Sequence, residues 1–187
     1  SLSRSTASLV LEDAEKSRDL KSFHSGRKLL VLKSHSQVEF KFDELIKELE
    51  KKKMQSVLSV VSVDVEYATI VQYGPVYPAL LLVGTDTEVI VVWLDKLKQN
   101  GRMCVNGESS LKRFLEMEWI VKIGVGIVSD LKKLIEFWRL EERIEFEGFH
   151  GILELEEMRR NEEKLGMKEL AEKVLKRSIS KKKVNGV

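Results

Sequence analysis

Two acidic residues near the end of an apolar segment could bind a metal ion. Asp64 and Glu66 close the segment Ser56–Glu66, whose β-branched residues predict a buried strand. Side chains two residues apart in a strand project from the same face, so both carboxylates would point the same way. Two adjacent negative charges are costly unless a cation lies between them, and a divalent metal is the simplest such cation. The alternative is that the strand ends at Val63 and both acids face water.

A third acidic residue, Asp130, follows a glycine-containing turn. The segment Trp119–Val125 predicts a strand, and Ser129–Leu140 predicts a helix with Asp130 in its first turn. Ser and Asp are common N-cap residues, and acids favour helix N-termini, so Ser129 or Asp130 could simply cap this helix. Taken alone, this segment therefore leaves capping and metal binding open.

The rest of the pattern predicts the elements that position these acids. A short strand over Arg27–Leu32 precedes an amphipathic helix over Phe42–Lys53, whose apolar residues recur at helical spacing. The remaining expected elements are the strands Ala79–Val83 and Glu88–Trp93 with a hairpin loop at 84–87, the helices Leu94–Leu97, Ser109–Met117 and Lys168–Leu175, and an extended or mixed segment Ile144–Leu155. Clustered strands that later alternate with helices predict an α/β fold with a mixed central sheet flanked by helices.

Composition narrows the class of protein. The 187 residues carry 32 basic and 30 acidic side chains, so the net charge indicates no particular partner. The single cysteine, Cys104, excludes an intrachain disulfide and zinc sites built on cysteine pairs, and it suits a reducing compartment. No apolar run reaches the roughly 18–20 residues of a membrane span. We therefore expect an intracellular protein, nuclear or cytoplasmic, without a membrane partner.

The C-terminal residues are strongly basic. From residue 168 to 187 there are seven basic and two acidic residues. A basic segment of this kind can bind nucleic-acid phosphates, although a solvated terminus is the simpler interpretation. The candidate phosphate-binding residues are Lys176, Arg177, Lys181, Lys182 and Lys183.

The order and spacing of the acids resemble two motifs of a known family. Asp64-Val65-Glu66, followed some sixty residues later by Gly-Val-Gly-Ile-x-x-Asp-x-x-x-Leu at 124–134, resembles the first two motifs of the DEDD superfamily of 3′–5′ exonucleases. The RNase D and Werner-type branch is the most similar. The segments Gly148–Leu155 and Leu165–Leu175 also resemble later parts of that family, so the resemblance extends from about residue 28 to 180.

This resemblance implies a fold, a chemistry and a substrate class. It implies an RNase H-like exonuclease domain over residues 27–180, with a flexible segment 1–26 before it and a basic tail 181–187 after it. In the family, carboxylates hold two divalent metals, Mg²⁺ or Mn²⁺, that activate a water and stabilise the leaving oxygen. By the resemblance Asp64 would bridge both metals, Glu66 would bind the metal that carries the water, and Asp130 would help to hold the other. The implied substrates are RNA or single-stranded DNA, trimmed from the 3′ end.

One departure from the family leaves two interpretations. The third family motif, Tyr-x-x-x-Asp or His-x-x-x-Asp, should follow Leu175, but no Asp, Tyr or His occurs between Leu175 and Val187. Either the chain stops short of that motif, or the domain has lost catalysis. In the second case we expect a catalytically inactive module, without a metal cofactor, that binds RNA or partner proteins as a scaffold.

Overall fold

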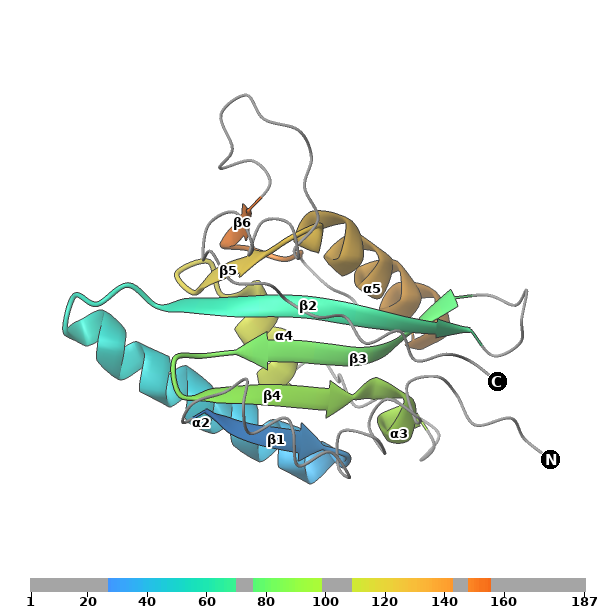
Figure 1. Ribbon diagram of the computed structural model, residues 1–187, viewed down its shortest axis with the longest axis horizontal. Coiled ribbons are helices and arrows are strands. Elements are labelled where there is room, and N and C mark those ends of the chain that lie inside the picture. Colours follow the sequence, from blue (N-terminus) through green and yellow to red (C-terminus); the bar gives the residue numbers. More distant parts are fainter. Residues whose placement is uncertain (1–26, 70–75, 99–108, 143–147, 156–187) are drawn as a thin grey trace.

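The fold is built around one mixed β-sheet. A computed structural model describes residues 27–69, 76–98, 109–142 and 148–155, and within these ranges six strands pair in the order β1-β4-β3-β2-β5-β6 (Figure 1). Strand β3 is antiparallel to both of its neighbours, whereas the other neighbouring pairs are parallel. The strands are β1 Lys28–Leu32, β2 Val60–Thr69, β3 Val76–Gly84, β4 Glu88–Trp93, β5 Val121–Gly124 and β6 Ile152–Glu154. The predicted α/β fold with a mixed central sheet is confirmed.

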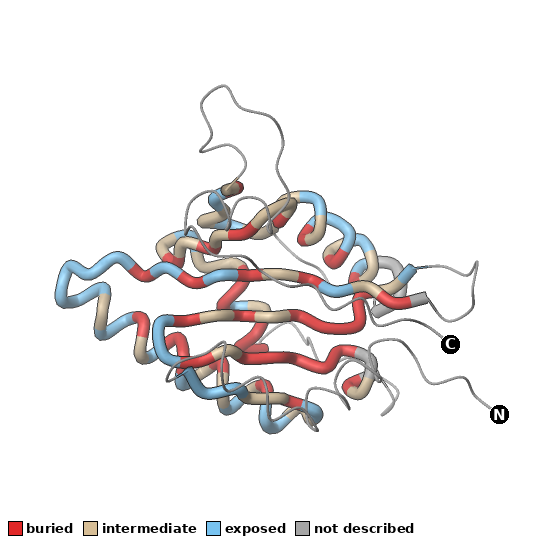
Figure 2. The backbone as a smooth tube through the Cα atoms, in the orientation of Figure 1, coloured by how far each residue is buried: buried red, intermediate tan, exposed pale blue. Residues whose placement is uncertain are grey.

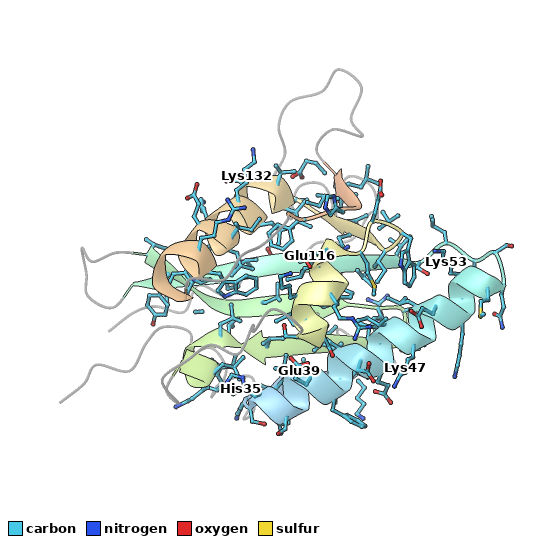
Figure 3. All side chains as sticks on the ribbon, turned by 180° about the vertical axis from the view of Figure 1, so that it is seen from behind. His35, Glu39, Lys47, Lys53, Glu116 and Lys132 are labelled. Atoms are coloured by element: carbon cyan, nitrogen blue, oxygen red, sulfur yellow. The ribbon has the colours of Figure 1, made fainter. Side chains whose placement is uncertain are left out.

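Helices α2, α4 and α5 pack on the same face of this sheet, which is turned toward the viewer in Figure 3. The described helices are α2 His35–Met54, α3 Leu94–Lys98, α4 Ser110–Glu116 and α5 Ile127–Glu142. One apolar cluster joins Val63 of β2 to the helices, and the Phe42 and Phe114 rings of α2 and α4 meet edge-on with their centroids 5.1 Å apart. Figure 2 shows the resulting burial along the central strands. This core fixes the helices relative to the strand that carries the acids.

Helix α2 is longer than the sequence pattern predicted. It begins at His35, whereas the apolar spacing predicted a start at Phe42. A capping box sets the true start: the Ser34 hydroxyl accepts a hydrogen bond from the Gln37 N–H, and the Gln37 side chain accepts one from the Ser34 N–H. The first turns of the helix therefore follow from local hydrogen bonding, which a search for apolar periodicity misses.

Strand β2 is displaced toward the C-terminus relative to its predicted range. It was predicted over Ser56–Glu66 but spans Val60–Thr69. The residues after α2 make a turn in which Ser56 has a positive φ of 57°, and a strand cannot continue through that conformation. At its other end, β2 continues beyond both acids. The alternative in which the strand ends at Val63 is therefore wrong.

The predicted hairpin loop is confirmed, and a serine side chain caps α4. The hairpin loop after Gly84 is closed by a hydrogen bond from the Thr85 N–H to the Glu88 carbonyl (2.8 Å). Ser109 caps α4, because its hydroxyl accepts a hydrogen bond from the Lys112 N–H (3.1 Å).

Several predictions lie outside the described residues. These are the N-terminal segment 1–26, residues 144–147 of the segment 144–155, the helix Lys168–Leu175 and the basic tail 181–187. None of the helices that the structure describes combines the length and hydropathy that spanning a membrane requires.

A buried lysine joins β5 to the segment that leads into β6. The Lys122 side chain is fully buried, and its ammonium lies 5.6 Å from the centroid of the Phe114 ring. It donates hydrogen bonds to three backbone carbonyls, those of Met117 (2.8 Å), Ile120 (3.1 Å) and His150 (3.0 Å). Burial lowers the pKa of Lys122 to about 8, because the charged form loses its hydration. Three carbonyl groups and an aromatic ring therefore surround this buried ammonium in place of water.

This depressed pKa predicts a pH dependence of stability. Between pH 8 and 10.5 the unfolded chain binds a proton at Lys122 that the folded chain has lost, so this residue makes the free energy of unfolding rise with pH. Relative to a Lys122→Met variant, the native protein should gain up to about 3 kcal/mol over this range, as measured by denaturant unfolding at several pH values.

Lys47 is exposed, so Lys47→Met is the matched control. The difference in free energy of unfolding between Lys47→Met and the native protein should stay constant with pH. The prediction would be contradicted if the difference in free energy of unfolding between Lys122→Met and the native protein also stayed constant with pH.

Candidate active site

Asp64 and Glu66 lie on the face of β2 that is turned away from the helices. The buried residues Val63 and Val65 alternate with them and pack into the helix-facing core. Asp64 is half-buried, and one of its carboxylate oxygens accepts a hydrogen bond from the Val65 N–H (3.0 Å). Glu66 is exposed. The strand therefore projects both carboxylates from the same face, with Asp64 in the less solvated position.

The neighbouring strand stops before it reaches these acids. Strand β5 pairs with residues 60–62 of β2 only, so the part of β2 that carries Asp64 and Glu66 has no strand on this side. The chain leaves β5 at Gly124, where a Cβ atom would lie 2.6 Å from the Val63 carbonyl oxygen and 2.9 Å from the Ile127 Cβ. Glycine thus lets α5 start directly beside β2.

Helix α5 begins two residues earlier than predicted. It starts at Ile127 instead of Ser129, so Ser129 and Asp130 both lie inside its first turn. The alternative in which one of them is the N-cap is therefore wrong. The chain enters the helix through Gly126, whose φ of 73° is in the left-handed region.

Asp130 lies close enough to Asp64 for their charges to interact. Asp130 is half-buried, and its pKa is raised chiefly by burial and further by the negative charges of Asp64 and Glu154. Lys133 acts in the opposite direction, with its ammonium 3.9 Å from the Asp130 carboxylate. A strand and a helix that are distant in sequence therefore bring two carboxylates together.

Tyr67 fixes the helix against the strand at this point. Its hydroxyl donates a hydrogen bond to the backbone carbonyl of Asp130 (2.7 Å), and the Lys133 ammonium lies 5.4 Å from the centroid of its ring. Burial, followed by the charges of Asp130 and Asp64, raises the pKa of Tyr67, so the phenol keeps its proton at physiological pH and remains a donor.

The carboxylate oxygens of Asp64 and Asp130 suit a hard divalent cation. Mg²⁺ is commonly held by one or two carboxylates, with water and substrate oxygens completing its coordination. Among the described residues, no three His, Cys, Asp or Glu side chains form a metal-binding group. The oxygen donors of Asp64 and Asp130 are thus of the type that such a cation prefers, and the predicted metal site formed by Asp64, Glu66 and Asp130 stays a prediction.

Sequence reasoning missed one acidic residue at this site. Glu154 of β6 is buried, and its charge contributes to the raised pKa of Asp130. The available signal was an acid placed between Leu153 and Leu155 in a segment predicted to be extended. The predicted phosphate-binding residues lie outside the described part of the chain: Lys176, Arg177, Lys181, Lys182 and Lys183.

Comparisons with known proteins agree with this geometry. The sequence model of the 3′–5′ exonuclease family matches residues 35–186. The crystal structure of the EXD2 exonuclease domain is 21% identical with a TM-score of 0.50, and the match covers 81% of this chain and 72% of that one. The same domain soaked in Mg is 25% identical with a TM-score of 0.52, covering 80% and 70%. No curated protein sequence matches the chain. The predicted RNase H-like exonuclease fold is confirmed.

The close approach at Gly124 predicts a ranking of two glycine variants. Gly124→Ala should lower the free energy of unfolding by about 3 kcal/mol or more, because the added methyl group meets backbone and a packed side chain. Gly126→Ala should cost only about 1–2 kcal/mol, because its positive φ is strained but the space around it is open. Denaturant unfolding of both variants measures these losses in free energy of unfolding. A larger loss in Gly126→Ala than in Gly124→Ala would contradict the prediction.

Proposed function

Because this chain belongs to the 3′–5′ exonuclease family, we propose that it removes nucleotides from the 3′ end of RNA or single-stranded DNA by metal-dependent hydrolysis. The observation that carries the proposal is the approach of Asp64 on β2 to Asp130 on α5. In this proposal Asp64, Glu66 and Asp130 hold Mg²⁺ or Mn²⁺. The EXD2 exonuclease domain, which has a similar fold, has been soaked in Mg.

The proposed chemistry assigns different tasks to the residues of the site. Two divalent cations, when bound, supply an activated water and stabilise the charge that develops on the leaving oxygen. Asp64 and Asp130 are half-buried, so their charges are less screened than those of surface acids and attract a cation more strongly. Tyr67 holds the Asp130 backbone against β2 and so limits the separation of the two carboxylates. Glu66, which is exposed on the same face of β2, would be the third carboxylate of the site.

A second candidate function has its own supporting observation. Within the described ranges, no three potential ligand side chains form a metal-binding group. A domain with a weakened metal site can keep its nucleic-acid or protein surface after catalysis is lost. The alternative proposal is therefore a catalytically inactive module that binds RNA or a partner protein as part of a larger assembly.

A nuclease assay tests the proposed activity. With Mg²⁺ or Mn²⁺, the protein should shorten a 5′-labelled single-stranded oligonucleotide one nucleotide at a time from its 3′ end, and a chelator should abolish this activity. Asp64→Asn should lower the rate by about 100-fold or more. Loss of a residue that only hydrogen-bonds to a metal ligand typically costs about 10- to 100-fold in activity, and loss of the ligand itself should cost more.

Asp43→Asn is the matched control, because Asp43 is an acid on α2 that pairs with Lys47 outside the site. The cleavage rate of Asp43→Asn should equal that of the native protein. Equal activity in the native protein and Asp64→Asn would exclude this site as the source of the nuclease. Binding of the oligonucleotide without cleavage by any of the three proteins would favour the inactive module.

A further inference from the structure

We propose that Glu154 is a positioning residue for the cation site: its carboxylate holds the turn before α5 and the first turn of that helix, and with them Asp130, against the edge of the sheet. This inference rests on the proposed function, because it concerns the cation that Asp64 and Asp130 would bind. Glu154 does not bind the cation itself in this proposal. It acts through the helix that carries Asp130.

The contacts of Glu154 show how the helix is held. One carboxylate oxygen accepts a hydrogen bond from the Gly126 N–H (2.8 Å), and the other faces the Val128 N–H (3.4 Å). These two N–H groups belong to the turn into α5 and to its first turn, where a helix has no internal acceptors for them. A negative charge at this end of a helix also interacts favourably with the helix dipole. Glu154 thus caps the start of α5, which the candidate cap residues Ser129 and Asp130 do not do.

The strand that carries Glu154 is itself rigidly placed. In the β5–β6 pairing Glu154 lies opposite Gly124, and the Leu155 N–H donates a hydrogen bond to the Gly124 carbonyl (2.9 Å). Before β6, Gly151 packs so tightly that a Cβ atom would lie 2.4 Å from the Ile120 carbonyl oxygen. The His150 carbonyl accepts a hydrogen bond from the buried Lys122. Glu154 is therefore held by the sheet, and it can fix α5 without moving itself.

The burial of Glu154 makes its two hydrogen bonds necessary. Its residue is only 8% exposed, and a buried carboxylate is costly unless its oxygens are satisfied. The two N–H groups at the start of α5 satisfy both oxygens, so Glu154 and the start of the helix hold each other in place. Because Asp130 follows Val128 by two residues in the same turn, loss of this contact should displace Asp130 and weaken cation binding.

The test is a measurement of Mn²⁺ affinity, with the signal of free Mn²⁺ in electron paramagnetic resonance as the readout and without substrate. In Glu154→Gln one oxygen remains to accept an N–H, but the charge is lost and the amide NH₂ opposes the second N–H. We expect the dissociation constant to rise about 10-fold in Glu154→Gln and by about 10- to 100-fold in Glu154→Ala. Glu136→Gln removes an exposed charge from the same helix and should leave the affinity unchanged.

The outcomes separate this inference from the proposed function. Weaker Mn²⁺ binding by Glu154→Gln, with native affinity in Glu136→Gln, supports the positioning role. Native affinity in Glu154→Gln together with loss of binding in Asp64→Asn overturns the role of Glu154 and leaves the proposed site intact. Absence of Mn²⁺ binding by the native protein overturns both. Because Glu154→Gln keeps the side-chain volume, the result stands even if Glu154→Ala fails to fold.

Discussion

The unequal lengths of two neighbouring parallel strands are the constraint on which the site depends. Strand β2 continues to Thr69, whereas β5 stops at Gly124 after pairing with the first residues of β2. Beyond Gly124 the chain turns into α5, whose first turn brings Asp130 near Asp64. A sheet with strands of equal length would put another strand there and would keep the two carboxylates apart.

The fold supports this concentration of negative charge with fixed polar groups. Backbone N–H groups satisfy Glu154, the Lys133 ammonium lies near Asp130, and the Tyr67 hydroxyl binds the backbone beside it. Burial is the main cause of the raised pKa of Asp130, and the charges of Asp64 and Glu154 add to it, whereas Lys133 acts in the opposite direction. In the proposed function, a divalent cation would compensate these carboxylates.

Local patterns in the sequence predicted the fold and proposed Asp64, Glu66 and Asp130 as site residues, whereas contacts between distant segments could not be read from them. The β-branched residues around Val63 predicted the strand that carries the acids, and the family resemblance is confirmed. The start of α2 was missed although Ser34 and Gln37 form a recognisable capping pattern. Glu154 could not be assigned from local pattern, because it satisfies N–H groups 26 and 28 residues earlier in the chain. Only the pairing of β6 with β5 reveals that contact.

The buried amine of Lys122 gives the molecule an internal reporter. Its ammonium is enclosed by carbonyl groups and the Phe114 ring, so an acylating reagent in solution cannot reach it while the sheet is closed. Surface lysines such as Lys47 react continuously, whereas Lys122 reacts only during the intervals when the junction of β5 and β6 opens. The rate at which mass spectrometry detects acylated Lys122 therefore measures how often this part of the sheet, which also carries Glu154, comes apart.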